Sequence, residues 1–145
     1  MMESHFPPAN QDQRRVRVLL VDDMPQVRRD LHQLLELTGS IEVIAEAADG
    51  QQAVRLAAEL SPDVIIMDLE MPGMDGFDAT EKIKAQGLSS RNVILSMHIS
   101  QENIARAMSA GADEFIVKGA SFDILIDAIL GRKDAPDPIH QEKGN

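Results

Sequence analysis

The sequence contains no cysteine, tryptophan or tyrosine, and aromatic residues make up only 3% of its 145 positions. Without cysteine the chain has no disulfide framework, thiolate nucleophile or cysteine-based zinc site, and a reducing compartment is expected, with the cytoplasm as the default. The core must instead be built from aliphatic side chains and methionine. With so few rings, sites that stack nucleobases or clamp a flavin are disfavoured.

Long apolar runs are also missing. No segment approaches the ~18 consecutive apolar residues of a membrane span, and the start MMESHFPPANQDQRR lacks the apolar stretch of a signal peptide. The net charge of -10 argues against direct binding to nucleic acid, because phosphate contacts come from clustered lysine and arginine. We therefore expect a soluble, unexported cytoplasmic protein with no membrane contact and no direct nucleic-acid partner.

One folded domain is expected between two looser ends. Hydrophobic residues at 43% and charged residues at 26% are typical of a globular protein, and the length suits a single core. Residues 1–14 include PPANQDQ and show no apolar periodicity, which predicts a flexible N-terminal leader. Residues 132–145 mix proline, glycine and charge, as a C-terminal tail or linker stub does. The folded domain is thus expected over residues 15–131.

Short apolar runs alternate with segments of helical periodicity along this domain. The runs, each predicted to form a strand, cover residues 16–21, 41–47, 63–68, 92–97 and 114–118. Gly39, Gly87 and Gly111 stand where a left-handed residue ends a helix, and Ser121 stands where an N-cap would. Strict alternation predicts an α/β fold, with a doubly wound parallel sheet between helices. Because residues 41–47 alternate apolar side chains with glutamates, that strand should lie at an edge.

Polar side chains suited to phosphoryl chemistry follow four of the five predicted strands. They are Asp22, Asp23, Asp68, Ser96 and Lys118. Ligands of such sheets bind beyond the carboxyl ends of the strands, so these side chains should converge. Three carboxylates on one edge repel one another unless one takes up a proton or a hard cation binds, and Mg²⁺ is the simplest solution. A hydroxyl and an ammonium facing the same point are the donors that phosphoryl transfer requires, which makes Asp68 the candidate nucleophile.

The residues after Asp68 predict a turn that contributes to the cation site. Pro72 and Gly73 turn the chain directly beyond the strand, which would let the backbone carbonyl of Glu70 face a metal. Each polar residue also has a purely structural interpretation, since the acid pair could cap the next helix and Lys118 could be a solvated surface charge. The combination is more specific than its parts, because the predicted edge strand 41–47 carries no such residue.

Four segments resemble the receiver domains of two-component response regulators: LLVDDMPQVRR, DVIIMDLEMPGMDG, VILSMH and GADEFIVKGA. The resemblance covers residues 16–130 and implies a (βα)5 flavodoxin-like fold, a three-layer α/β/α sandwich with strand order 2-1-3-4-5. It also implies that Asp68 accepts a phosphoryl group from a sensor histidine kinase or a histidine phosphotransfer protein. Such a domain is a signalling phosphoacceptor and not an enzyme, since it catalyses only its own Mg-dependent phosphorylation and autodephosphorylation.

The resemblance assigns the residues around the phosphoacceptor as well. The ligands of Mg²⁺, or of Mn²⁺ in its place, would be Asp22, Asp23, Asp68 and the backbone carbonyl of Glu70, with Asp22 acting through water. Ser96 and Lys118 would bind the phosphoryl oxygens. Glu70 and His98 occupy positions that flank the path of the hydrolytic water in this family, so they are expected to tune the lifetime of the phosphorylated state.

A switch is implied by the aromatic residue three positions before Lys118, which is Phe115. Phosphorylation would draw Ser96 inward and let Phe115 fill the vacated space, remodelling the surface of the fourth helix, fifth strand and fifth helix. Phe115 departs from the more common tyrosine and has no hydroxyl with which to report outward. The remodelled surface would control a downstream protein or an output domain, and a phosphorylation-dependent homodimer is also compatible with the family.

Four other functions share some of these features. A haloacid-dehalogenase-like phosphohydrolase requires a second aspartate two residues after the nucleophile, where Glu70 stands, and its metal-binding acids come late in the chain. A flavodoxin-like electron carrier needs a Ser/Thr/Gly-rich phosphate loop where DDMPQ stands. An EF-hand needs glutamate at its twelfth position, where Ala79 stands. A phosphate-independent receiver-like interaction domain would not require all of the polar residues present.

Overall fold

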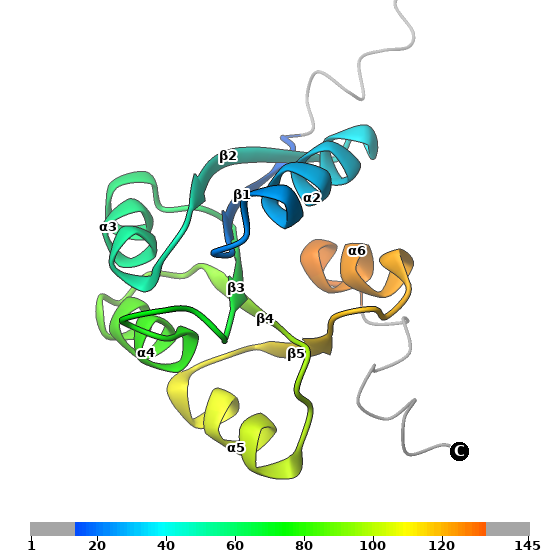
Figure 1. Cartoon of the computed structure of the whole chain (residues 1–145). Helices are drawn as coiled ribbons and strands as arrows, with labels where there is room; N and C mark the ends of the chain where they lie inside the picture. Colours follow the sequence, from blue (N-terminus) through cyan, green and yellow to red (C-terminus); the bar gives the residue numbers. More distant parts are fainter. Residues whose placement is uncertain (1–13, 133–145) are drawn as a thin grey trace, which may run out of the picture.

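The computed structural model describes residues 14–132, in which five strands alternate with five helices (Figure 1). The strands are β1 (Val16–Val21), β2 (Ile41–Ala47), β3 (Val64–Asp68), β4 (Arg91–Ser96) and β5 (Glu114–Val117). The helices are α2 (Pro25–Leu37), α3 (Gly50–Leu60), α4 (Gly76–Ala85), α5 (Gln101–Ala110) and α6 (Phe122–Leu130). Apart from Arg14 and Arg132, the predicted leader and tail lie outside the described residues.

Neighbouring strands pair in parallel in the order β2-β1-β3-β4-β5, which confirms the doubly wound sheet and the edge position of β2. Four strand boundaries differ from the prediction by one residue: β3 starts at Val64, β4 starts at Arg91 and ends at Ser96, and β5 ends at Val117. Met97 was predicted to lie in β4 but has left the ladder and is 62% exposed. The apolar run is therefore longer than the strand, and Ser96 is the last residue of β4.

Helices cover both faces of the sheet (Figure 1). On one face Leu35 of α2 and Leu125 of α6 pack in a cluster with Ile66 of β3. On the other face α3, α4 and α5 close a second cluster, in which Ile83 of α4 packs with Phe115 of β5. Every residue of β3 is buried, so burial on both faces fixes this central strand in place. Within residues 14–132 no helix is long and apolar enough to cross a bilayer.

The register of the strands aligns their carboxyl ends. Val21, the last residue of β1, pairs with Met67, so the residue that follows β1 is level with Asp68. Asp68 in turn pairs with Leu95, the residue before Ser96. The side chains that leave these three strand ends therefore lie along one edge of the sheet.

Side-chain caps mark the starts of four helices but not of α2. The capping residues are Asp49 for α3, Asp75 for α4, Ser100 for α5 and Ser121 for α6, which confirms the prediction for Ser121. Positive φ angles also confirm the three glycines predicted at helix ends. The N-cap of α2 is Met24, whose side chain makes no cap hydrogen bond, and Pro25 follows it. The interpretation of the acid pair as an N-cap is therefore wrong.

The turn after β3 brings the start of α4 against the backbone of Asp68. The N–H of Gly76 donates to the carbonyl oxygen of Leu69 at 3.1 Å. A Cβ atom at position 76 would overlap the Asp68 carbonyl and approach the Leu69 Cα to 2.8 Å. The conformation of the chain beyond Asp68 therefore requires glycine at this position.

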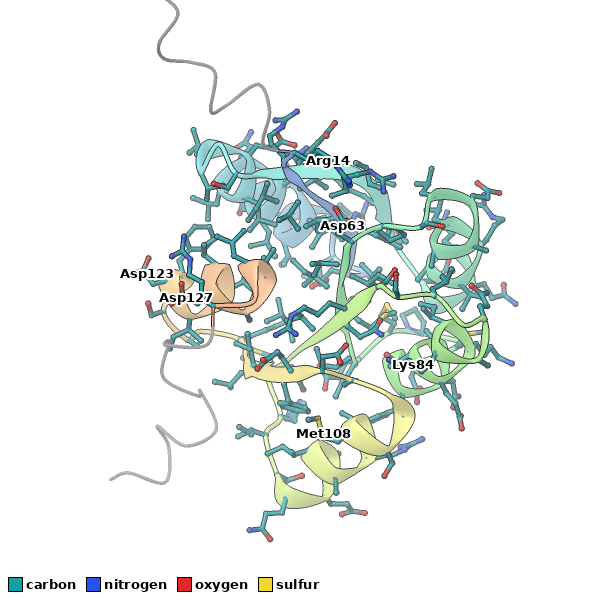
Figure 2. The ribbon with its side chains drawn as sticks, turned by 180° about the vertical axis from the view of Figure 1, so that it is seen from behind. Arg14, Asp63, Lys84, Met108, Asp123 and Asp127 are labelled. Carbon is teal, nitrogen blue, oxygen red and sulfur yellow. The ribbon has the colours of Figure 1, made fainter. Side chains whose placement is uncertain are left out.

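The amino ends of the strands form an edge of different chemistry. Figure 2 shows Arg14 and Asp63 close to each other before β1 and β3, with a nitrogen-to-oxygen distance of 3.9 Å. The Asp63 carboxylate also accepts the backbone N–H of Arg17 at 2.8 Å. Basic and acidic groups offset one another here, whereas the carboxyl edge gathers acidic groups.

We predict that Gly76→Ala destabilises the fold, even though alanine normally stabilises a helix relative to glycine. The added Cβ must displace the Asp68 and Leu69 backbone, and such overpacking costs about 1–3 kcal/mol. Urea unfolding followed by far-UV circular dichroism measures the effect. Gly39→Ala is the control, because its φ of +78° strains an alanine but no atom lies within 4 Å of the new Cβ. Equal or smaller destabilisation by Gly76→Ala would contradict the steric argument.

Candidate functional site

The carboxyl edge of the sheet brings together the three predicted acidic residues. Asp22 and Asp23 follow β1, while Asp68 ends β3. One carboxylate oxygen from each residue lies within 4.8 Å of the others. Asp22 is 3% exposed and Asp68 is 2% exposed, so two of the three carboxylates are almost entirely removed from bulk water. Keeping these charges together requires compensation nearby.

Lys118 supplies part of that compensation. Its Nζ lies 3.1 Å from Oδ2 of Asp22 and 3.2 Å from Oδ1 of Asp68, so one ammonium bridges both buried carboxylates. The backbone also holds it in position, since the N–H of Lys118 donates to the carbonyl of Ser96 at 2.8 Å and extends the ladder between β4 and β5. The interpretation of Lys118 as a solvated surface charge is wrong, because the side chain is only 21% exposed and is paired twice.

Burial and charge shift the acidity of this cluster. Desolvation is the largest influence on Asp68, and together with the negative charge of Asp22 it raises the pKa of Asp68 from 3.8 to about 6, although Lys118 acts in the opposite direction. Desolvation alone would lower the pKa of Lys118, but the charges of Asp68 and Asp22 outweigh it and raise that pKa above its usual value. Lys118 therefore remains an ammonium. Its single positive charge does not balance the negative charge of the three acidic residues.

The donor set suits a small, hard cation. Three carboxylates face one ammonium, and hard oxygen ligands are those that Mg²⁺ prefers. Desolvation raises the pKa of Asp68 most, and the negative charge of Asp22 raises it further; a divalent cation would offset this second effect. Asp22, Asp23 and Asp68 therefore fit Mg²⁺, or Mn²⁺ in its place. The Glu70 carbonyl as a further ligand stays a prediction.

Ser96, at the end of β4, is fully buried and hydrogen bonded to Glu70. Its hydroxyl donates to Oε2 of Glu70 at 2.8 Å and accepts the backbone N–H of His98 at 3.0 Å. Glu70 is exposed and also approaches Asp68, because its backbone N–H donates to Oδ1 of Asp68 at 3.3 Å. The structure thus connects the two predicted tuning positions to Ser96, Glu70 through its side chain and His98 through its backbone.

Phe115 lies in the core beneath this edge. It is 1% exposed and pairs with Ile94, two residues before Ser96, so Phe115 and Ser96 belong to the same face of the sheet. Ala107 of α5 packs in the same cluster as Phe115. The ring is therefore placed between the end of β4 and helix α5, where a change at one could affect the other.

Two contacts at the site were not predicted from the sequence: the hydrogen bond from Ser96 to Glu70 described above, and a contact made by Arg28. The guanidinium of Arg28, in the first turns of α2, donates from Nη1 to the backbone carbonyl of Asp22 at 2.7 Å. The sequence signal for it is weak, because arginine is mostly found exposed and an arginine in a helix is readily interpreted as a solvated surface charge.

Comparisons with known proteins agree on one family. The response regulator receiver domain family matches residues 18–130. The transcriptional regulatory protein LiaR of Bacillus subtilis is 44% identical over 114 residues, which is 79% of this chain and 54% of LiaR. The nitrate/nitrite response regulator NarL of Escherichia coli K12 is 36% identical over 118 residues, 81% of this chain and 55% of NarL. This chain spans about half the length of these relatives.

A solved structure agrees as well. The receiver domain of the response regulator NarL from Mycobacterium tuberculosis superposes with a TM-score of 0.76 at 32% identity, covering 82% of this chain and 99% of that one. The phosphohydrolase and the flavodoxin-like electron carrier considered above are not favoured by any of these similarities.

We predict that Asp68→Asn stabilises the protein above neutral pH when no divalent cation is present. Asp68 binds its proton more tightly in the folded state, where its pKa is about 6, than in the unfolded chain, where it is near 3.8. This stabilisation is complete below the unfolded value and is lost as the pH rises through about 6. Asparagine imitates the neutral form, so the gain should be about 1–3 kcal/mol at about pH 7.5 and should shrink toward about pH 4.

The measurement is urea unfolding in EDTA across that pH range. Asp30→Asn, at an exposed carboxylate of α2, provides the background effect of the same substitution. A stability difference between Asp68→Asn and wild type that stays constant with pH would contradict the prediction.

Proposed function

Since the chain belongs to the response regulator receiver domain family, we propose that Asp68 is the phosphoacceptor of a two-component phosphorelay. The observation that carries this proposal is the Lys118 ammonium, which bridges Asp68 and Asp22 within a buried acidic cluster. The donor is a phosphohistidine of a sensor histidine kinase or a histidine phosphotransfer protein. A carboxylate oxygen of Asp68 forms the new bond to phosphorus while the phosphorus–nitrogen bond of the donor breaks, and the imidazole leaves with its electron pair and takes up a proton.

Asp22, Asp23, Asp68 and the backbone carbonyl of Glu70 would hold Mg²⁺, or Mn²⁺ in its place. When bound, the cation offsets the negative charge of the carboxylates and of the incoming phosphoryl oxygens. The Nζ of Lys118 already lies 3.2 Å from Oδ1 of Asp68, and it would stabilise the negative charge of the phosphoryl oxygens once the group is bound to Asp68. Catalysis by the chain is then limited to its own phosphorylation and autodephosphorylation.

Ser96 and Phe115 form the proposed switch. To donate to a phosphoryl oxygen, the hydroxyl of Ser96 must leave Oε2 of Glu70, with which it now shares a 2.8 Å hydrogen bond. Phe115 then occupies the space that Ser96 vacates, and the surface of α5, β5 and α6 changes. Support comes from the shared sheet face of the two residues and from the packing of Phe115 with α5.

This surface would act on a downstream protein, on an output domain, or on a second copy of the chain in a phosphorylation-dependent homodimer. Two relatives are named as a transcriptional regulator and a nitrate/nitrite response regulator, and the chain covers about half of each. An output in transcription is therefore proposed, with DNA contacted by another module and not by this acidic domain, whose chain carries a net charge of -10.

We predict that acetyl phosphate and Mg²⁺ add one phosphoryl group to the wild-type chain and none to Asp68→Asn, because asparagine offers no carboxylate nucleophile. Intact-mass spectrometry detects the product, and Asp30→Asn should be phosphorylated like wild type. Labelling of Asp68→Asn, or no labelling of wild type with either acetyl phosphate or kinase, would refute the proposal. Sustained turnover of a phosphate ester would favour a phosphohydrolase instead.

A further prediction concerns Glu70 as a tuning residue. Glu70→Ala removes the acceptor that holds Ser96 and a negative charge beside the phosphoryl site, so phosphorylation by acetyl phosphate should be several-fold faster. The loss of a carboxylate able to orient water should lengthen the half-life of phosphorylated Asp68. His98→Ala should have a smaller effect, because His98 contacts Ser96 through its backbone.

Phosphorylation and decay are followed by intact mass, and unfolding in urea checks that folding is hardly affected. Glu81→Ala, at an exposed glutamate of α4, is the matched control. Rates for Glu70→Ala that equal those of the Glu81 variant would rule out the tuning role.

A further inference from the structure

Arg28 connects helix α2 to the backbone of the acid pair. Its side chain is only 17% exposed, Nη1 donates to the Asp22 carbonyl at 2.7 Å, and Nε donates to Oε1 of Glu46 at 3.0 Å. We propose that Arg28 is a positioning residue of the cation site, which sets the direction of the Asp23 carboxylate by holding the peptide between Asp22 and Asp23. The inference rests on the proposed function, in that it assumes Mg²⁺ binds this acidic cluster.

The Asp22 residue is held at each of its other polar groups. Its N–H donates to the carbonyl of Ala47 in β2 at 3.1 Å, and Oδ1 accepts the N–H of Met24 at 2.9 Å. Oδ2 accepts from Lys118 at 3.1 Å. Among the described residues, the hydrogen bond that the structure records at the Asp22 carbonyl comes from Arg28.

The carbonyl is the group that matters for Asp23. A peptide unit is planar, so the carbonyl of Asp22, the nitrogen of Asp23 and the Cα of Asp23 move together. Rotation of this plane would turn the Asp23 side chain relative to Asp68, which ends β3, and to the Asp22 carboxylate, which Met24 and Lys118 hold. Asp23 is also the more exposed member of the acid pair. Arg28 is therefore placed to orient the carboxylate of the cluster for which the structure records no pairing with Lys118 among the described residues.

Glu46 and His32 in turn hold Arg28. Glu46 lies on edge strand β2, and its Oε2 is 2.6 Å from Nδ1 of His32, one turn along α2 from Arg28. Burial favours a higher pKa for Glu46, but hydrogen bonds from His32 and Arg28 outweigh it and lower that pKa, so the group is a carboxylate at neutral pH. The guanidinium is thus clamped between a charged acceptor on β2 and the Asp22 carbonyl.

Arginine is suited to this place by its shape. The two contacts use different nitrogens of one planar group, which point toward Glu46 and Asp22 at the same time. A lysine has a single ammonium on a flexible stem and cannot reproduce both directions. Arg28→Lys therefore keeps the charge near the cluster while it removes the two-point contact. Arg29→Lys changes the same residue type at the next position, where the side chain is exposed and contacts Gln26 at 3.4 Å.

The test is isothermal titration calorimetry, which measures the affinity of the complete chain for Mg²⁺. Wild type and Arg29→Lys should bind with the same affinity, Asp23→Ala should lose binding, and Arg28→Lys should bind about 10-fold more weakly. The Mg²⁺ concentration for half-maximal phosphorylation by acetyl phosphate should rise by the same factor in Arg28→Lys, while the rate at saturating Mg²⁺ stays close to wild type.

An unchanged Mg²⁺ affinity in Arg28→Lys overturns the inference, including when urea unfolding in EDTA shows that the variant is less stable. Should Arg28→Lys fail to fold, Glu46→Gln decides, because it leaves the guanidinium in place but weakens its anchor, and wild-type affinity there overturns the inference too. Failure of wild type to bind Mg²⁺, or wild-type binding by Asp23→Ala, refutes the proposed cation site itself. Weaker binding by the Arg28 and Glu46 variants, together with wild-type affinity in Arg29→Lys and lost binding in Asp23→Ala, supports the positioning role.

Discussion

The contact on which the site depends is a single lysine ammonium between two buried carboxylates. Lys118 lies 3.1 Å from Asp22 and 3.2 Å from Asp68, and without it two nearly unexposed negative charges would face each other. Buried pairs of this kind are costly to desolvate, and one positive charge cannot fully offset three acids. The protein's own groups therefore leave an excess of negative charge at the site, which is the condition under which a cation gains most by binding.

The stability for such a site has to come from elsewhere in the fold. The aliphatic clusters on both faces of the sheet bury β3 completely and bring its last residue, Asp68, to a fixed position. Separate side chains cap α3, α4, α5 and α6, and α2 starts with a proline, so the acid pair has no capping role. Different residues therefore stabilise the fold and form the polar site. The carboxyl edge can hold carboxylates that repel one another, because the aliphatic clusters stabilise the fold.

Sequence patterns predicted the alternating elements, the edge position of β2 and the residues gathered at the carboxyl edge, because burial and strand-end chemistry are local signals. They misplaced four strand boundaries by one residue, since a side chain such as that of Met97 does not reveal whether its backbone is still paired. They also gave no indication that Glu70 holds Ser96 or that Arg28 holds the Asp22 carbonyl. Those contacts depend on side-chain conformations across segments distant in sequence, which no spacing encodes.

Gly76 has an evolutionary consequence. Its missing side chain lets α4 begin directly against the Asp68 carbonyl, so the absence of a Cβ atom serves both the packing of the helix and the position of Asp68. A side chain at position 76 would therefore disturb the start of α4 and the position of Asp68 together. At Gly73, at the tip of the same turn, no atom lies within 4 Å of the place that a Cβ would take, and only the φ of +73° restrains the residue. Variation in this loop should accumulate at the tip and stop at its base.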